Sequence, residues 1–298
     1  MLNNNFCQLV QTYQFNDNLI CYGARQMDNQ RKNIENKYEI ISPKQDFILQ
    51  LTKRKYLKPS NLMFITMVFS KLSEKGITNF YDKPFIMSLK EYTEFRGISF
   101  NKARDKVKDD LDALFDMYIS LDYYDKSNHI KTDFRLINEK SVINKSVIYF
   151  WFTPQFLSYY SNLKYIMPLS KEIFRFDLRY NPNSFTLAYK LHINTNINER
   201  KDNKNSDCLS VRTLLEYCPK IPTYDNKMKS QGGLNQRIIQ PFVRDMNAIN
   251  IIDWCFLDEN NNIVDKNNIK SYVDFIDLKV KYTWKNGYEK EVLKKKRD

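Results

Sequence analysis

The chain has 298 residues, and its contents of 42% hydrophobic and 14% aromatic residues exclude wholesale disorder. Lys and Arg number 47 against 35 Asp and Glu; the resulting charge of +12 favours a polyanionic partner, nucleic acid first and an anionic membrane surface second. No apolar run reaches the ~20 residues that span a bilayer, and the N-terminus lacks the pattern of a signal peptide, so we expect a cytoplasmic protein without membrane association.

Residues 1–44 are rich in Asn and Gln and lack regularly spaced apolar residues, so we expect a flexible N-terminal arm. Apolar content then rises, and the run Leu62–Leu72 predicts a largely buried helix. Asn61 or Ser60 is expected to cap the start of this helix, and Gly76 to end it.

A short helix and a longer helix follow, separated by a glycine turn. Ser88 stands three residues before Glu91, which is the spacing of a capping box, and it opens a helix that Gly97 ends. A second helix is predicted at Ser99–Phe115, with an apolar face made of Phe100, Ala103, Val107, Leu111 and Leu114. Helix, glycine turn and helix together predict a helix-turn-helix motif.

Three strand-like runs come next, at Tyr118–Tyr124, Thr132–Ile137 and Val147–Thr153. The stretch Asp125–Asn128, between the first two runs, has the pattern of a turn, so these two runs are expected to form a β-hairpin. A β-hairpin that follows a helix-turn-helix is a wing, so we interpret this half of the chain as a winged-helix domain. Gln155–Leu163 predicts a closing helix, and the first domain is expected to cover residues 45–167.

The second half repeats this order and is expected to form a domain at residues 168–285, beginning at Pro168. Asn183–Ile193 has a helical pattern, and the polar run Asn194–Asp207 predicts a solvent loop. Ser210–Tyr217 predicts another short helix.

The helix predicted at Gly232–Ile249 has one apolar face and one polar, basic face. At about 100° per residue, the apolar face consists of Leu234, Ile238, Phe242, Met246 and Ile249. The polar face consists of Gln236, Arg237, Gln240, Arg244 and Asn247. Such side chains form paired hydrogen bonds with guanine and adenine edges, so we expect these five residues to contact bases. The alternative is a surface helix whose polar face meets only water. Pro241 is expected to kink or shorten the helix near Arg237.

The second domain is expected to end in another hairpin, and the chain in a basic tail. Trp254 and Phe256 precede the turn Asp258–Asn262, and Tyr272–Tyr282 has a strand pattern. Residues 286–298 form the tail, which we interpret as a solubilising segment, with a phosphate-binding arm as the alternative.

Two hexapeptides indicate an internal repeat: DDLDAL at Asp109–Leu114 and RDMNAI at Arg244–Ile249 occupy the same point of the two halves. The polar face of the helix predicted at Ser99–Phe115 carries the carboxylates Asp105, Asp109 and Asp112, which repel phosphate. We therefore expect the second domain to read bases, and the first to serve protein contacts or to touch the DNA backbone. The residues expected to contact phosphate are Lys102, Arg104, Lys227, Lys229, Lys279, Lys281 and Lys285.

The residues give little support to catalysis. The only histidines, His129 and His192, lie in different halves, so they cannot form the His-x-His metal cluster of a nicking enzyme. Asp274 and Asp277 are the nearest approach to a metal-binding pair, but on a strand their spacing points them to opposite faces. The five cysteines form no Cys-x-x-Cys pair, and no phosphate-binding Gly-x-x-x-x-Gly-Lys loop is present. We expect reduced thiols, no metal, no cofactor and no enzyme activity.

The segment LSVRTLLEYC, the basic stretch QRIIQPFVRDMNAI and the hairpin opening at Asp253–Trp254 together resemble the C-terminal winged-helix domain of plasmid replication initiator proteins. The resemblance extends over about residues 45–284 and is strongest at 209–256. It implies an α+β, mainly helical protein with two tandem winged-helix domains. It also implies an initiator that binds repeated double-stranded DNA sites at an origin, dimerises through its first domain and recruits host replication proteins. The alternative is a winged-helix transcriptional regulator, and a nucleic-acid-processing enzyme fits the residues least.

Overall fold

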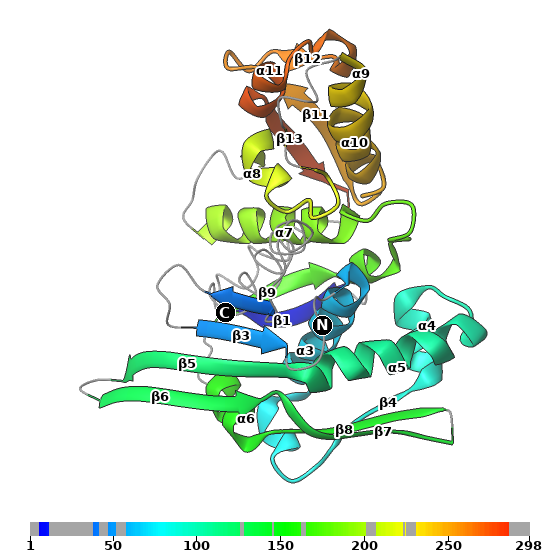
Figure 1. Ribbon diagram of the computed structural model, residues 1–298, viewed down its shortest axis with the longest axis vertical. Helices are drawn as coiled ribbons and strands as arrows, with labels where there is room; N and C mark the ends of the chain where they lie inside the picture. Colours follow the sequence, from blue (N-terminus) through cyan, green and yellow to red (C-terminus); the bar gives the residue numbers. More distant parts are fainter. Residues whose placement is uncertain are drawn as a thin grey trace. The chain divides into compact units, whose positions relative to one another are not determined.

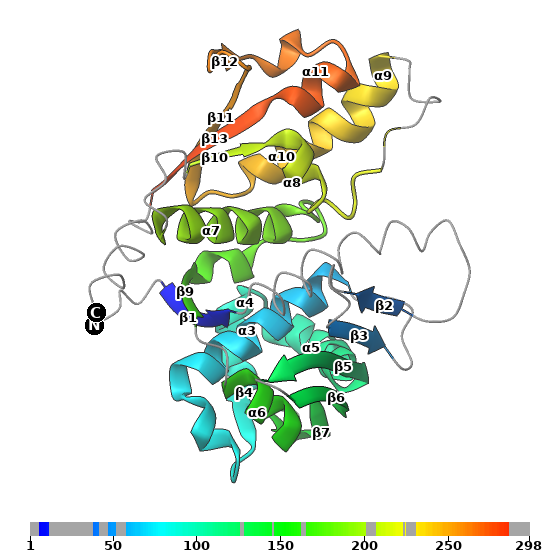
Figure 2. The same cartoon turned by 90° about the vertical axis from the view of Figure 1, so that its left-hand side faces the viewer.

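The computed structural model describes residues 6–11, 38–41, 47–51, 58–125, 128–144, 146–161, 165–200, 207–222, 224 and 231–285. The chain divides into two compact units (Figures 1 and 2). Residues 7–166 form the N-terminal unit, and residues 167–298, with the first six residues, form the C-terminal unit. The borders fall within β1 (Phe6–Gln11) and β9 (Tyr165–Ser170). Helices and antiparallel strands are mixed in both units, which confirms an α+β protein.

Among the described residues, the N-terminal unit contains a four-stranded and a three-stranded antiparallel sheet. The first has the strand order β2 (Tyr38–Ile41), β3 (Phe47–Leu51), β5 (Met117–Asp125) and β6 (Asn128–Arg135). The second has the order β4 (Phe85–Ser88), β8 (Val147–Phe152) and β7 (Ile137–Ile143). The helices are α3 (Pro59–Lys75), the 3-10 turn η2 (Ile77–Phe80), α4 (Leu89–Arg96), α5 (Phe100–Asp116) and α6 (Pro154–Ser161).

Phenylalanine rings join the second sheet to the helices of this unit. Phe85 of β4 stacks on Phe150 of β8 with ring centroids 4.6 Å apart. Phe69 of α3 stacks on Phe156 of α6 at 5.5 Å, and α3 is buried along most of its length. Because each buried Phe side chain contributes about 1.5–3 kcal/mol, this cluster is a main source of the unit's stability.

The helix-turn-helix predicted from the sequence is present as α4 and α5. The Ser88 hydroxyl accepts a hydrogen bond from the Glu91 amide at 3.0 Å, and Gly97 ends α4 in the left-handed region with φ of 58°. α5 buries the residues expected on its apolar face, namely Ala103, Val107, Leu111 and Leu114. Phe100 was expected on that face but is 41% exposed, because it begins the helix and its ring lies against the Arg104 guanidinium instead.

The strand pairing of this unit corrects two expectations. The hairpin β5–β6, expected to be the wing, belongs to the first sheet, where β5 pairs with β3. The hairpin next to the helix-turn-helix is β7–β8, and β8 pairs with β4 immediately before α4. Two segments of the expected flexible arm, β1 and β2, are strands, and the rest of residues 1–44 lies outside the described part. An alternating pattern predicts burial but not the pairing partner, so the sequence could not show which hairpin lies beside the helix-turn-helix.

In the described part of the C-terminal unit, four strands form an antiparallel sheet. Its strand order is β10 (Cys208–Ser210), β13 (Lys279–Trp284), β11 (Ile252–Leu257) and β12 (Ile263–Val264). Its helical elements are η3 (Lys171–Arg175), α7 (Ser184–Arg200), α8 (Val211–Leu215), α9 (Gln231–Leu234), the π-helical turn η5 (Asn235–Ile239), α10 (Gln240–Asn247), η6 (Lys266–Asn268) and α11 (Tyr272–Asp277). Phe242 of α10, Phe256 of β11 and Phe275 of α11 pack with centroids 5.6 to 6.2 Å apart, so α10 is fixed on the sheet.

Two expectations for this unit are wrong. α7 continues to Arg200, so the first part of the expected loop Asn194–Asp207 is helical. Its polar sequence concealed this, because Thr195 is buried and bonds to the Tyr282 hydroxyl rather than to water. Tyr272–Asp277 is a helix and not the start of a strand, since Ser271 and Asp274 form a capping box.

The two units share one structural plan, which supports the internal repeat. Each has a long helix, a short strand, a helix capped by a serine, a longer helix and then a hairpin. Asn61 of α3 donates from Nδ2 to Asp110 of α5 at 2.7 Å. In the same way, Asn183 at the start of α7 donates to Asp245 of α10 at 2.6 Å. Both aspartates are 0% exposed and occupy matching positions of the two related hexapeptides.

Candidate nucleic-acid interface

The helical stretch from α9 to α10 separates an apolar face from a polar face as predicted. The apolar residues are all 6% exposed or less, namely Leu234, Ile238, Phe242, Met246 and Ile249. The residues expected to contact bases are all exposed, namely Gln236, Arg237, Gln240, Arg244 and Asn247. The hydrophobic face therefore orients this helix, and the polar side chains face outward from the unit.

Pro241 changes the form of the helix without ending it. Proline has no amide proton, and in a regular α-helix its ring would press on the carbonyl four residues earlier, at Arg237. The chain instead widens into the π-helical turn Asn235–Ile239, in which the Gln240 amide bonds to the Asn235 carbonyl. Gln236 and Arg237 lie in this turn. The irregularity occurs where the sequence predicted it, and the helix continues through it.

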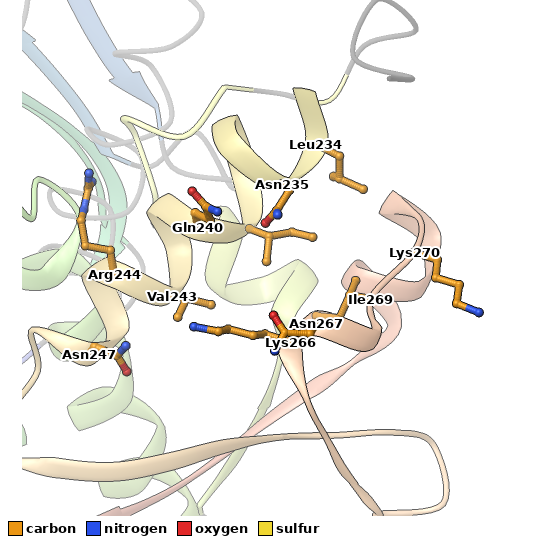
Figure 3. A pocket seen from close by; sticks show the side chains of 11 residues that line it. Leu234, Asn235, Gln240, Val243, Arg244, Asn247, Lys266, Asn267, Ile269 and Lys270 are labelled. Carbon is orange, nitrogen blue, oxygen red and sulfur yellow. The ribbon is translucent and has the colours of Figure 1, made fainter. Parts of the chain in front are cut away.

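A groove lies between the polar face of this helix and the segment that precedes α11 (Figure 3). It has a volume of about 780 Å³. Lys266, Asn267, Ile269 and Lys270 form the side opposite the helix, and the Lys266 side chain extends toward α10. Sequence reasoning missed these residues. The sequence feature that could have indicated them is the polar, basic run Asp265–Lys270, which follows β12. Its position beside α10 arises only in the folded chain.

Arg244 is held by a buried carboxylate. Its Nε and Nη2 atoms bond to Oδ1 of Asp245 at 3.0 and 2.9 Å, while half of the Arg244 side chain stays exposed. The other oxygen of Asp245 accepts from the Asn183 amide and from Asn183 Nδ2, at 3.1 and 2.6 Å. Burial raises the pKa of Asp245, and the bonds from Asn183 and Arg244 oppose that rise.

Asn247 is held by the neighbouring strand. The Trp254 indole of β11 donates a hydrogen bond from Nε1 to Oδ1 of Asn247 at 3.1 Å. The Trp254 ring meets Phe256 edge to face at 5.1 Å, so the indole is itself fixed on the sheet. Two of the five expected base-contacting residues are therefore held in position by other side chains.

The residues expected to contact phosphate are dispersed. Lys281 and Lys285 are exposed at the end of the sheet, where Lys285 pairs with Asp253 at 2.8 Å, and Lys279 is half-buried. Lys102 and Arg104 are exposed on α5 of the N-terminal unit. Lys227 and Lys229 lie outside the described residues.

The matching face of α5 differs in charge from that of α10. Asp109 pairs with Lys58 at 3.1 Å, and Asp112 pairs with Lys140 of β7. A groove of about 530 Å³ lies between α5 and β7, and Lys140 on its β7 side pairs with Asp112 of α5. This face offers less net positive charge to a phosphate backbone than the face of α10.

His192 has a structural role. It is 0% exposed, and its Nδ1 lies 2.7 Å from the Ala188 carbonyl while Nε2 accepts from the Ser170 amide at 3.1 Å. Its ring lies 4.2 Å from that of Trp284. Burial lowers the pKa of His192 to about 3, so the ring is neutral at pH 7.

The carboxylate pair considered for metal binding is engaged in structural contacts. Because Tyr272–Asp277 is a helix, Asp274 and Asp277 lie one turn apart and not on opposite faces of a strand. Asp274 accepts from the Ser271 amide at 3.0 Å, and Asp277 pairs with Arg212 at 3.1 Å. Within the described ranges, no group of three or more His, Cys, Asp and Glu residues could hold a metal ion. The described thiols of Cys208, Cys218 and Cys255 are free.

None of the helices in the described part is long and apolar enough to cross a membrane.

No protein-family model matches the sequence, and no curated protein matches it. Among solved structures, the Pi initiator protein in complex with iteron DNA aligns over 96% of this chain and 100% of its own, with 14% identity and a TM-score of 0.54. Domains 2–3 of RctB align over 86% of this chain and 93% of their own, with 9% identity and a TM-score of 0.45. The WH1 domain of MSBI1.176, a replication protein isolated from a multiple sclerosis patient, aligns over 35% of this chain and 79% of its own, with 16% identity and a TM-score of 0.28. The chain therefore has the fold of the Pi initiator protein, in agreement with the resemblance of its sequence to plasmid replication initiators.

Proposed function

We propose that this protein is a plasmid replication initiator that binds repeated double-stranded DNA sites at an origin without catalysing a reaction. Each unit acts as a winged-helix domain, with hairpin β7–β8 as the wing of the first and the β11–β13 region as the wing of the second. The fold shared with the Pi initiator protein, which was solved in complex with iteron DNA, supports this proposal.

The observation that carries the proposal is the polar face of the helix from α9 to α10. It presents two arginines, two glutamines and an asparagine, all exposed, and it carries no exposed carboxylate between Asn235 and Asn247. The only acidic residue of that stretch, Asp245, is 0% exposed. An exposed helix with this set of donors and acceptors can enter the major groove and form hydrogen bonds with base edges.

The N-terminal unit has a different part in this proposal. The carboxylates of α5 pair with Lys58 and Lys140, so this helix suits protein contacts better than base reading. Lys102 and Arg104 remain exposed on it and can hold the DNA backbone. Self-association through this unit and the recruitment of host replication proteins complete the proposed role.

The test is a comparison of binding to a specific and a scrambled duplex. The full-length protein first selects its site from a pool of random duplexes, and fluorescence anisotropy then follows binding to both duplexes over a salt series. We expect a preference of about 1,000-fold or more for the selected duplex. Arg237→Ala is expected to weaken specific binding by about 1–3 kcal/mol, whereas Arg175→Ala removes the same charge on η3 and leaves the preference intact.

Equal and steeply salt-dependent binding to both duplexes would refute the proposal, because the positive charge alone would then account for the attraction. Initiation is tested with a plasmid that carries the selected sites and no other origin, in cells that supply this chain. The native protein is expected to maintain that plasmid and Arg237→Ala to lose it, whereas a transcriptional regulator would not support its replication.

A further inference from the structure

We infer that the C-terminal end of the polar face of α10 presents hydrogen-bond donors only, and that Arg244 and Asn247 thereby select guanine. This inference rests on the proposed function, because it specifies which base edge the helix accepts. Two contacts made within the protein carry it, and both constrain the side chains before DNA is bound.

The first contact fixes the amide of Asn247. An asparagine side chain has one acceptor oxygen and one donor NH₂ group, and it reads adenine by using both. The Trp254 indole nitrogen can only donate, and it lies 3.1 Å from Oδ1 of Asn247. Turning the amide over would place two donors against each other, so the oxygen stays toward the indole. Nδ2 is left to face the exposed side of the helix.

The second contact fixes the guanidinium of Arg244. Its Nε and Nη2 atoms bond to one oxygen of Asp245, a residue that is 0% exposed. Asn183 occupies the other oxygen with two further hydrogen bonds. A guanidinium has five N–H groups, so the outer edge of Arg244, formed by Nη1 and the second hydrogen of Nη2, remains for a ligand.

These two donors are three residues apart on one helix face, so they lie next to each other. In the major groove, guanine presents two acceptors, N7 and O6, whereas adenine presents one acceptor and one donor. A donor-only surface is satisfied by guanine and leaves the N6 amino group of adenine facing another donor. The structure therefore assigns guanine to this end of the helix.

The other end of the same face has no such constraint. For Gln236 and Gln240 the described residues provide no hydrogen-bond partner, so both amides keep a donor and an acceptor for DNA. Glutamine with both groups free suits adenine. The two ends of one helix therefore differ in the base that they accept, and the side chains of Trp254 and Asp245 cause the difference.

The experiment selects binding sites from a random duplex pool with the native protein, Asn247→Ala and Trp254→Phe. The Asn247→Ala variant identifies the contacted position, because discrimination is lost there alone. At that position we expect guanine for the native protein, and a shift toward adenine for Trp254→Phe, in which the amide is free to turn. Trp151→Phe is the matched control, since it removes an indole that bonds to Tyr149 in the N-terminal unit and leaves α10 intact.

A second measurement does not depend on selection with variants. Each guanine of the native site is replaced by 7-deazaguanine, which lacks the N7 acceptor, and binding is measured with the native protein and with Asn247→Ala. At one guanine, the replacement is expected to weaken binding by the native protein by about fivefold to tenfold, which is the scale of one hydrogen bond. The same replacement is expected to have no effect on binding by Asn247→Ala.

Adenine at the Asn247 position, or an unchanged preference in a folded Trp254→Phe variant, would overturn the inference. A uniform weakening of all sequences by Asn247→Ala would also overturn it, because Asn247 would then contact phosphate. These results leave the proposed function standing. If the native protein enriches no sequence from the pool, the proposed function itself fails.

Discussion

The buried pair of Asn183 and Asp245 leads to a quantitative prediction about stability. Asn183→Ala removes the 2.6 Å bond from Nδ2 to Asp245 and the bond that Asn183 Oδ1 accepts from the Lys220 amide at 2.9 Å. A hydrogen bond to a charged group contributes about 1.5–3 kcal/mol, whereas water can replace the bond to the exposed Lys220. We therefore expect the free energy of unfolding of the C-terminal unit to fall by about 2–3 kcal/mol at pH 7.

The pH dependence of this loss has a defined sign. Burial raises the pKa of Asp245, and Asn183 opposes that rise by stabilising the carboxylate. When the amide is removed, the pKa rises further, and the resulting cost is present only at pH values above the folded-state pKa of Asp245 in the native protein, which burial has raised above its ordinary value. The destabilisation by Asn183→Ala is therefore expected to be larger at pH 7 than at pH 4.

Urea unfolding of the full chain at both pH values measures this effect, with Asn250→Ala as the control because Asn250 is exposed. The control is expected to change stability by less than about 0.5 kcal/mol. A loss of similar size in both variants, or additive losses in an Asn183→Ala and Asp245→Ala double-mutant cycle, would refute the reasoning.

Two further predictions concern single residues. Because the pKa of His192 is lowered to about 3 while the unfolded chain binds a proton below about 6.5, the C-terminal unit is expected to lose about 1.4 kcal/mol per pH unit as the pH falls between these values. The slope, measured by urea unfolding at several pH values, is expected to flatten in His192→Gln; an equally steep profile in that variant would contradict the assignment. Gly97 has φ of 58°, so Gly97→Ala is expected to destabilise the N-terminal unit by about 1–2 kcal/mol. An unchanged urea midpoint for that unit would show that the turn relaxes at no cost.

The sequence predicted those features that depend on local periodicity and capping. The apolar face from Leu234 to Ile249 persists through Pro241, so both the helix and its exposed polar residues could be placed. The serine at position 88 and the glycine at position 97 defined the ends of α4 for the same local reason.

Features that depend on tertiary contacts could not be predicted. A charged residue such as Asp245 has the sequence pattern of an exposed position, and its contacts with Asn183 and Arg244 make its burial acceptable. Lys266 and Lys270 lie more than twenty residues beyond most of α10, and sequence spacing does not reveal that they face it across a groove. The partner of a strand likewise depends on the sheet, and the sequence does not reveal that β8 pairs with β4 next to the helix-turn-helix.

The π-helical turn at Asn235–Ile239 also bears on how this protein can change in evolution. A π turn contains one residue more than an α turn, and it is enclosed by regular helix on the C-terminal side and by the buried Leu234 on the other. Removal of one residue from the turn, together with replacement of Pro241, would convert it to a regular α turn while the apolar residues on both sides keep their places in the core. This exposed helical segment can therefore change in length by one residue, and present a different set of side chains, without a redesign of the core.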